Sequence, residues 1–193
     1  MATSSRVVCL VDPDGTELGV RDKEPAHREP VSLHRGVSLY VFRGQDLLVT
    51  QRSFHKKTWP GVWTNTCCGH PGPGESATEA ALRHLSLELG VSEVDETHVV
   101  LPDFRYQVTM GNGWAENEIC PVLAATVDSD WQVVPEPSEI VDHRWLPWAT
   151  FVQLALLGLT SPWSRLQVRE LLAAGFDPAQ LAPSVSPDRK VGV

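Results

Sequence analysis

A sharply bounded helix that follows a loop rich in glycine and proline constrains the fold of this chain most. Ser76 can cap the helix, and Glu79 stands three residues later, which completes a capping box. Gly90 stands where helices commonly end in a left-handed residue. The apolar stripe of the helix, at a spacing of three and four residues, consists of Leu82, Leu85 and Leu89. The sequence therefore predicts a helix over residues 77–89 with one face against a core.

Extended segments on both sides of this helix predict a mixed sheet. Apolar or alternating runs bounded by turn residues indicate strands. We expect strands over residues 6–11, 37–42, 47–51, 98–101, 104–109, 114–120, 122–127 and 140–146. Two more helices are expected near 148–158 and 164–174, whereas 21–35 and most of 59–74 are expected to be irregular. This order is typical of an α/β (α+β) sandwich: a single domain over residues 1–176, followed by a flexible tail over 177–193.

Composition and charge narrow the class of protein. The 193 residues are 42% hydrophobic and 21% charged, which is ordinary for a globular domain. A net charge of −8 argues against nonspecific nucleic-acid binding and against a basic membrane surface. The longest apolar run, near residues 151–159, is about half of the roughly 20 residues that a membrane-spanning helix needs. No signal peptide and no disulfide framework is evident, so we expect a cytoplasmic protein with reduced thiols.

Part of the pattern around the helix is typical of enzymes that act on diphosphates. The spacing Gly69-x5-Glu75-x7-Arg83 resembles the Nudix box. Two later acids of that box, which hold magnesium ions in Nudix hydrolases, are replaced by His84 and Leu87, while Glu88 remains. The loss argues against hydrolysis but leaves one acid that can bind a metal. The alternative for Glu88 is a solvated acid on the helix face.

A second pair of acids, Glu116 and Glu118, lies in a predicted strand. Residues two apart point to one face of a strand, and two carboxylates that close repel unless a metal or a proton lies between them. His27, His34 and His70 could complete a six-coordinate site for Mn²⁺, Mg²⁺ or Zn²⁺. Exposed edge acids and exposed loop histidines are the alternatives. We apply the exposed interpretation fully to His55, His84, His98 and His143.

Cys68 is the candidate reactive thiol, because it directly precedes Gly69 and His70. A cysteine beside a metal site or basic groups has a lowered pKa and can act as acid, base or nucleophile. The alternative is a small buried hydrophobic residue, which we expect for Cys9 and Cys120. If this segment is a strand, the side chain of Cys67 points to the opposite face.

Several motifs taken together resemble type I isopentenyl-diphosphate isomerase. They are the run KKTWPGVWTN at residues 56–65, CGHP at 68–71, GES at 74–76, Tyr106, ENE-x-CP at 116–121 and SPW at 161–163. They stand in the family's order, and the resemblance covers about residues 6–175. It implies a Nudix-like α/β/α sandwich with a mixed sheet. It also implies reversible conversion of isopentenyl diphosphate to dimethylallyl diphosphate in isoprenoid biosynthesis, by antarafacial proton transfers through a tertiary carbocation.

The resemblance further implies a role for each matching residue. Cys68 and Glu118 would be the two acid/base groups on opposite faces of the substrate, with Tyr106 assisting near Glu118. The tightly bound divalent ion (Mn²⁺, Zn²⁺ or Mg²⁺) would be held by His27, His34, His70, Glu116 and Glu118. Glu88 would help to hold a Mg²⁺ that bridges to the diphosphate. The substrate would also contact Lys23, Arg52, Lys56 and Trp163.

Two other functions remain open from the residues themselves. A Nudix pyrophosphohydrolase of a nucleoside diphosphate derivative is the enzymatic alternative, disfavoured by the two missing acids and by a thiol that hydrolysis does not require. A metal-dependent binding domain is the other alternative, disfavoured by the complete acid/base set. For the isomerase we expect a small-molecule substrate, no nucleic-acid partner, no membrane insertion, and a monomer or weak homodimer.

Overall fold

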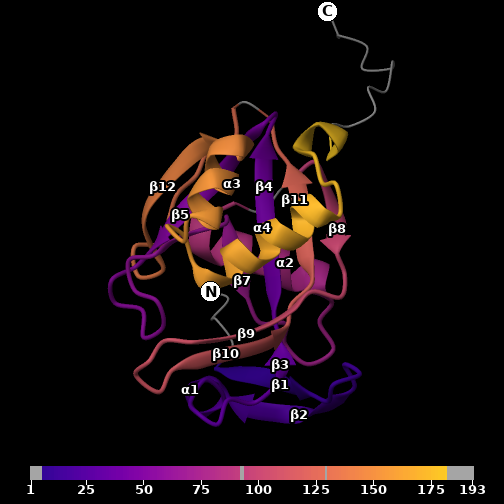
Figure 1. The fold of residues 1–193 in the computed structure, drawn as a ribbon, viewed down its shortest axis with the longest axis vertical. Coiled ribbons are helices and arrows are strands. Elements are labelled where there is room, and N and C mark those ends of the chain that lie inside the picture. The colour runs from indigo at the N-terminus through magenta and orange to yellow at the C-terminus, as the bar shows by residue number, and fades with distance from the viewer. Residues whose placement is uncertain (1–5, 92–93, 129, 182–193) are drawn as a thin grey trace, which may run out of the picture.

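Two sheets and three helices of more than two turns form the frame of the part of the protein that the structure describes (Figure 1). The structure, a computed structural model, describes residues 6–91, 94–128 and 130–181. One sheet consists of β4 (Val37–Arg43), β5 (Asp46–Arg52), β6 (Trp63–Thr64), β7 (Cys67–Gly69), β8 (Glu96–Leu101), β11 (Val122–Thr126) and β12 (Ile140–Pro147). Its order is β12-β5-β4-β11-β8, with β7 paired to β4 and β6 to β5.

This sheet is covered by helices on both faces. Helix α2 (Ala77–Leu89) lies behind it in Figure 1, and α3 (Trp148–Leu156) and α4 (Pro162–Ala173) lie in front. Strand β4 is buried along nearly its whole length, as its unbroken apolar run requires. Its alternate residues supply two separate cores: Leu39 packs toward α2, and Tyr40 packs toward α3 and α4. The predicted α/β/α sandwich with a mixed sheet is therefore confirmed.

Helix α2 confirms the predicted bounds, the capping box of Ser76 and Glu79, and the left-handed Gly90, whose φ is 69°. One detail was wrong: Leu82 is only half-buried. Both alanines and larger side chains of the helix pack against the sheet. The buried positions are Ala80, Ala81, His84, Leu85 and Leu89.

The second sheet, at the bottom of Figure 1, brings distant segments together. It consists, in spatial order, of β2 (Glu17–Asp22), β1 (Val7–Val11), β3 (His34–Arg35), β10 (Ala115–Ile119) and β9 (Arg105–Thr109). The expectation that residues 21–35 are irregular was wrong in part, because they include the end of β2, the short helix α1 (Lys23–Ala26) and β3. The register pairs Glu118 with His34 on one side and with Tyr106 on the other.

The remaining predicted strands and helices are confirmed, with ends that differ by a residue or two. Within the loop expected over 59–74, β6 and β7 are the extended pieces. The predicted tail over 177–193 falls mostly on residues 182–193, which lie outside the described residues. Its first residues form the short 3₁₀ helix η1 (Pro178–Leu181), of which Leu181 is buried against the α3–α4 side of the sheet. Across the described ranges, no helix is both long and apolar enough to cross a membrane.

We expect Leu85→Ala to lower the free energy of unfolding by about 2–5 kcal/mol, because it opens a cavity between α2 and the sheet. Leu85 is fully buried. Urea unfolding at a fixed metal concentration, followed by circular dichroism, measures the change. The control is Leu157→Ala at a position that is 74% exposed, where little change is expected. Equal losses in the two variants would contradict this packing.

Candidate active site and metal centre

A cleft of about 820 Å³ opens between the two sheets, and every site residue predicted above except His34 lines it. Strand β7 and the loop after it supply Cys68 and His70. Strand β10 supplies Glu116 and Glu118, which stand two apart and so share one face. His34 lies just beneath, fully buried in β3. The fold therefore gathers the predicted residues from segments about a hundred positions apart.

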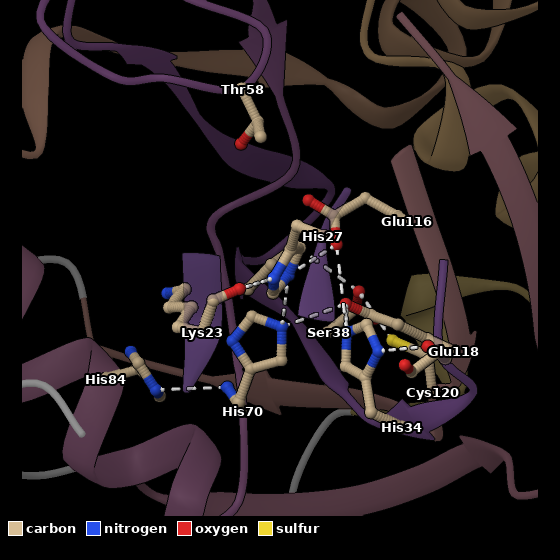
Figure 2. Close-up of polar contacts among 12 residues, drawn as sticks. Lys23, His27, His34, Ser38, Thr58, His70, His84, Glu116, Glu118 and Cys120 are labelled. Atoms are coloured by element: carbon tan, nitrogen blue, oxygen red, sulfur yellow. Dashed lines mark hydrogen bonds and ion pairs between the residues drawn. The ribbon is translucent and has the colours of Figure 1, made fainter. Parts of the chain in front are cut away.

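The three histidines and two glutamates of the predicted metal site point toward one another (Figure 2). One potential ligand atom from each of His27, His34, His70, Glu116 and Glu118 lies within 4.8 Å of all the others. The Nε2 atom of His27 is 2.8 Å from Glu116 Oε2, and the Nε2 atom of His70 is 3.1 Å from Glu118 Oε1. All five residues are buried or nearly so.

Backbone contacts fix which histidine nitrogens face the centre. His27 Nδ1 lies 2.5 Å from the Lys23 carbonyl, and His34 Nδ1 lies 2.7 Å from the Ser32 carbonyl. A carbonyl only accepts, so each Nδ1 carries the hydrogen and each Nε2 presents a lone pair to the cluster. Within the described part of the chain, His34 Nε2 and Glu116 Oε2 form no regular hydrogen bond, although His34 Nε2 lies 3.5 Å from Glu118 Oε1 and Glu116 Oε2 contacts His27 Nε2.

These lone pairs would repel one another without a positive charge among them. His27 Nε2 and His70 Nε2 are only 3.2 Å apart, and carboxylate oxygens surround them. Nitrogen and oxygen donors at this separation suit a divalent ion such as Mn²⁺ or Zn²⁺. The residues therefore fit a metal, and the cluster is a group that can hold one.

The ionisation of the cluster also suits metal binding. Burial raises the pKa of Glu118, but its close contacts with the His34 and His70 imidazoles outweigh burial and hold it well below its usual range. Burial and the charge of Lys23 keep the pKa of His70 well below its usual value. Burial also acts to lower the pKa of His34, but the contact with the Glu118 carboxylate outweighs burial and the pKa of His34 is raised. An ionised Glu118 and a neutral His70 are the forms that bind metals.

Cys68 lies half-buried, with its sulfur 3.2 Å from Ser38 Oγ and 3.3 Å from Asn65 Oδ1. Burial raises the pKa of this thiol to about 12, although both hydrogen bonds act to lower it. The expectation of a lowered pKa was therefore wrong, because burial and the nearby carboxylates outweigh any basic group. Cys67 points to the opposite face, as expected, and is buried in the core beneath α2.

Tyr106 lies beside Glu118 in the neighbouring strand, as the β9–β10 register requires. Burial and the charge of Glu118 raise the pKa of Tyr106 well above its usual value, so the phenol keeps its hydrogen. The cleft thus holds a protonated thiol, an ionised carboxylate and a neutral phenol.

The residues predicted to bind the diphosphate differ in their pKa values and in how far other contacts already occupy their charged groups. Burial lowers the pKa of Lys23, and it lowers the pKa of Lys56 to about 8. Lys56 also forms an ion pair with Glu139. Arg52 donates from Nε and Nη2 to the carbonyls of Trp59 and Thr58, at 3.2 and 2.9 Å. Part of its guanidinium is therefore committed to the loop.

Trp163 lies in the first turn of α4 and is 4% exposed at the wall of the cleft. Its indole Nε1 donates to Thr64 Oγ1 at 3.0 Å, and the Arg52 guanidinium lies 5.4 Å from the ring centre. Trp59 meets the ring edge-on at 5.3 Å. Trp59 itself has a φ of 43°, which is uncommon for a bulky residue.

His84 is the site residue that sequence reasoning missed. It was expected to be exposed, yet it is only 5% exposed. Its Nδ1 bonds Glu88 Oε1 at 3.0 Å, and its Nε2 accepts the backbone N–H of His70 at 3.2 Å. A Cβ atom on Gly69 would lie 2.0 Å from its ring. The signals in the sequence were that glycine and the four-residue spacing to Glu88.

Glu88 lines the cleft but is not part of the five-residue metal group. Its carboxylate lies on the α2 side, where His84 holds it. Ser38 and Asn65, which contact the Cys68 sulfur, were also not predicted. Ser38 stands in no recognisable local pattern, because only the pairing of β4 with β7 brings it to the thiol. Asn65 ends the KKTWPGVWTN run, but that run alone assigned it no role.

The NUDIX domain family model matches residues 32–168. The isopentenyl-diphosphate Delta-isomerase of Saccharopolyspora erythraea is 48% identical, over 90% of this chain and 89% of that protein. The enzymes of the same name from Mycolicibacterium vanbaalenii and Citrobacter koseri are 42% and 46% identical, over 90% and 86% of this chain and 95% and 94% of their own lengths.

Two solved structures share the fold at low sequence identity. A protein of Deinococcus radiodurans superimposes with a TM-score of 0.64 at 20% identity, over 85% of this chain and 98% of that one. A MutT protein of Methanosarcina mazei gives 0.55 at 16% identity, over 74% and 94%. The folds and the sequence relatives agree with the geometry of the cleft: the chain belongs to the isopentenyl-diphosphate Delta-isomerase family of NUDIX-domain proteins.

Proposed function

We propose that this protein interconverts isopentenyl diphosphate and dimethylallyl diphosphate in isoprenoid biosynthesis. The observation that carries the proposal is the pairing of a protonated thiol, Cys68, with an ionised carboxylate, Glu118, in one cleft. Moving a double bond by one position requires one proton delivered and one removed. This pair carries one proton and one vacant acceptor, which is what the reaction uses.

The alkene of the substrate is a weak base, so the acid must lie within reach and water must be kept away. In the proposed reaction one group protonates the terminal alkene carbon, and a tertiary carbocation forms. The other group then removes a proton from the neighbouring carbon, on the opposite face of the substrate. Tyr106 stays neutral and assists by hydrogen bonding near Glu118. Exchange with solvent then restores the starting protonation of the pair.

The remaining residues are proposed to orient the substrate. Lys23, Arg52 and Lys56 face the diphosphate, which reconciles a protein of net charge −8 with an anionic substrate. The face of the Trp163 indole lies by the cation, a contact worth about 0.5–2 kcal/mol. A divalent ion on the five-residue cluster would supply positive charge that holds Glu118 ionised and in place. Mg²⁺ held with Glu88 would offset diphosphate charge.

We further propose that the protein works in the cytoplasm, where thiols stay reduced, as a monomer or weak homodimer. Cys68 must keep its proton on sulfur for the reaction, and a reducing compartment preserves it. The proposed metal of the cluster is Mn²⁺, Zn²⁺ or Mg²⁺.

Incubation with isopentenyl diphosphate and Mg²⁺ in D₂O tests the reaction directly. We expect dimethylallyl diphosphate that carries deuterium from solvent, detected by NMR. A folded, metal-loaded protein that forms no isomer would overturn the proposal. Release of phosphate from nucleotide substrates in the same preparation would instead indicate a hydrolase.

Replacement of the two adjacent cysteines separates the catalytic thiol from the structural one. We expect Cys68→Ala to lower kcat on the order of 10²-fold or more, because the proton donor is lost. Cys67→Ala, its neighbour on the opposite face of β7, should keep most of the activity at a cost in stability. Equal losses of kcat in the two variants would argue against a special role for Cys68.

Metal content should fall as the pH falls. The pKa of His34 is raised, so protons compete for its Nε2 at higher pH than they would for an ordinary histidine, and metal binding strengthens as the pH rises. We expect tightly bound metal to be retained at about pH 8 and lost on dialysis below about pH 6. Plasma mass spectrometry of the dialysed protein measures it. Glu116→Gln should lose metal at both pH values, whereas His143→Gln, outside the cluster, should behave as the parent protein.

Substrate affinity should weaken in alkaline solution. Lys56 is charged below its pKa of about 8 and neutral above it, so its attraction for diphosphate is lost as the pH rises through that value. We expect KM to rise above about pH 8 while kcat changes less. Lys56→Met should have a high KM at every pH. Arg169→Met, which removes an exposed cation of α4 that does not line the cleft, serves as the control. A KM independent of pH in the parent protein would contradict this role.

A further inference from the structure

A chain of buried polar side chains leads from α4 to the Cys68 sulfur on the side away from the cleft. The Tyr40 hydroxyl donates to Gln167 Oε1 at 2.8 Å, and Gln167 Nε2 donates to Ser38 Oγ at 2.7 Å. Ser38 Oγ lies 3.2 Å from Cys68 Sγ. Tyr40 and Gln167 are 0% exposed and Ser38 is 1% exposed. None of the three lines the cleft, so the mechanism above does not use them.

The direction of each hydrogen bond around the Cys68 sulfur can be assigned by starting from Asn65. Asn65 Nδ2 donates to the carbonyls of Leu39 and Cys67, both at 3.0 Å. This leaves Asn65 Oδ1, which can only accept, facing the sulfur at 3.3 Å. The thiol hydrogen of Cys68 is therefore directed at Asn65.

The hydroxyl of Ser38 then has two sulfur atoms to which it could donate its own hydrogen. Its oxygen already accepts from Gln167, and the sulfur of Cys68 has its hydrogen directed elsewhere. The nearest remaining acceptor is the Cys68 sulfur at 3.2 Å, ahead of the Cys120 sulfur at 3.5 Å. The sulfur thus donates one hydrogen bond and accepts one.

We propose that Ser38 is a positioning residue for Cys68, and that Gln167 keeps the Ser38 hydrogen directed at the sulfur. When the thiol gives its hydrogen to carbon, an anionic sulfur remains, and the Ser38 hydroxyl is already in place to stabilise it. When the hydrogen returns, Asn65 accepts it again. This inference rests on the proposed isomerase function for its catalytic consequence, but the hydrogen bonds stand independently of it.

A purely structural role predicts something different. A buried glutamine that only satisfies Tyr40 and Ser38 would affect stability when removed, and would leave the sulfur unchanged. A hydrogen bond to a charged group typically contributes enough to change a rate by roughly 10- to 100-fold. Its loss should appear in kcat rather than KM, because Ser38 does not touch the substrate.

The infrared S–H stretching band of Cys68 tests the hydrogen bond without reference to activity or metal. A difference spectrum of the parent protein minus Cys68→Ala isolates this band from the other thiols. We expect Ser38→Ala to shift it to higher frequency, because a bond accepted by the sulfur strengthens the bond that its hydrogen donates. We expect the same variant to lower kcat roughly 10- to 100-fold with KM unchanged.

Gln167→Met provides the second variant if Ser38→Ala does not fold. It frees the Ser38 hydroxyl to rotate, so we expect the band to broaden and kcat to fall by a smaller factor. In the Ser38→Ala background the same substitution should have no further effect on kcat, since it acts through Ser38. The control is Thr126→Val, which removes a hydroxyl that is buried yet has no hydrogen-bond partner in the described part of the chain.

The outcomes separate this inference from the proposed function. An unchanged S–H band in a folded Ser38→Ala or Gln167→Met protein overturns the hydrogen-bond assignment. A shifted band with an unchanged kcat in an active isomerase overturns the positioning role. A shifted band in a protein that forms no isomer supports the hydrogen bonds and counts against the isomerase itself.

Discussion

The histidine nitrogens and carboxylate oxygens of the five-residue cluster lie within 4.8 Å of one another, and most of them direct a lone pair inward. This buried arrangement is stable only with positive charge among these atoms. The second sheet is arranged around that requirement. Strand β3 is only two residues long, yet it places His34 opposite Glu118 between β1 and β10. The carbonyls of Lys23 and Ser32 then turn two imidazoles so that their lone pairs face inward. A metal on this cluster would hold together four segments: the end of α1, strand β3, the loop after β7 and strand β10.

The two sheets therefore have different roles in the structure. The large sheet buries its central strand under helices on both faces and supplies rigidity. The small sheet, whose edge strand β2 is exposed throughout, supplies both acids and His34, whereas His27 follows α1 and His70 follows β7. Cys68 belongs to the first sheet and Glu118 to the second. The two proposed proton-transfer groups thus approach a substrate from different layers of the fold, which is how they can act on opposite faces.

Local patterns allowed more of the fold to be predicted than of the site. The bounds of α2 followed from a capping box and a terminal glycine, which depend on neighbours within one or two turns. The two glutamates of β10 followed from a period of two. By contrast, Ser38 and Gln167 stand 129 positions apart, and His84 lies buried only because Gly69 leaves room for its ring. Such contacts depend on tertiary packing, which no short-range periodicity records. The resemblance to a known family, rather than spacing, predicted which histidines converge.

Arg52 links the packing of Trp59 against Trp163 to the part of the cleft proposed for the diphosphate, two properties that a designer would want to vary separately. Its guanidinium holds the carbonyls of Thr58 and Trp59, and so supports the unusual backbone of Trp59, whose indole packs against Trp163. The same group lines the part of the cleft proposed for the diphosphate. To accept a longer or bulkier alkenyl chain, the packing of Trp59 against Trp163 would have to change. If that change were made through Arg52, it would also alter the affinity for the diphosphate. Variants of this enzyme with new substrates are therefore easier to reach by changing Trp163 and its partner Thr64 than by changing the arginine.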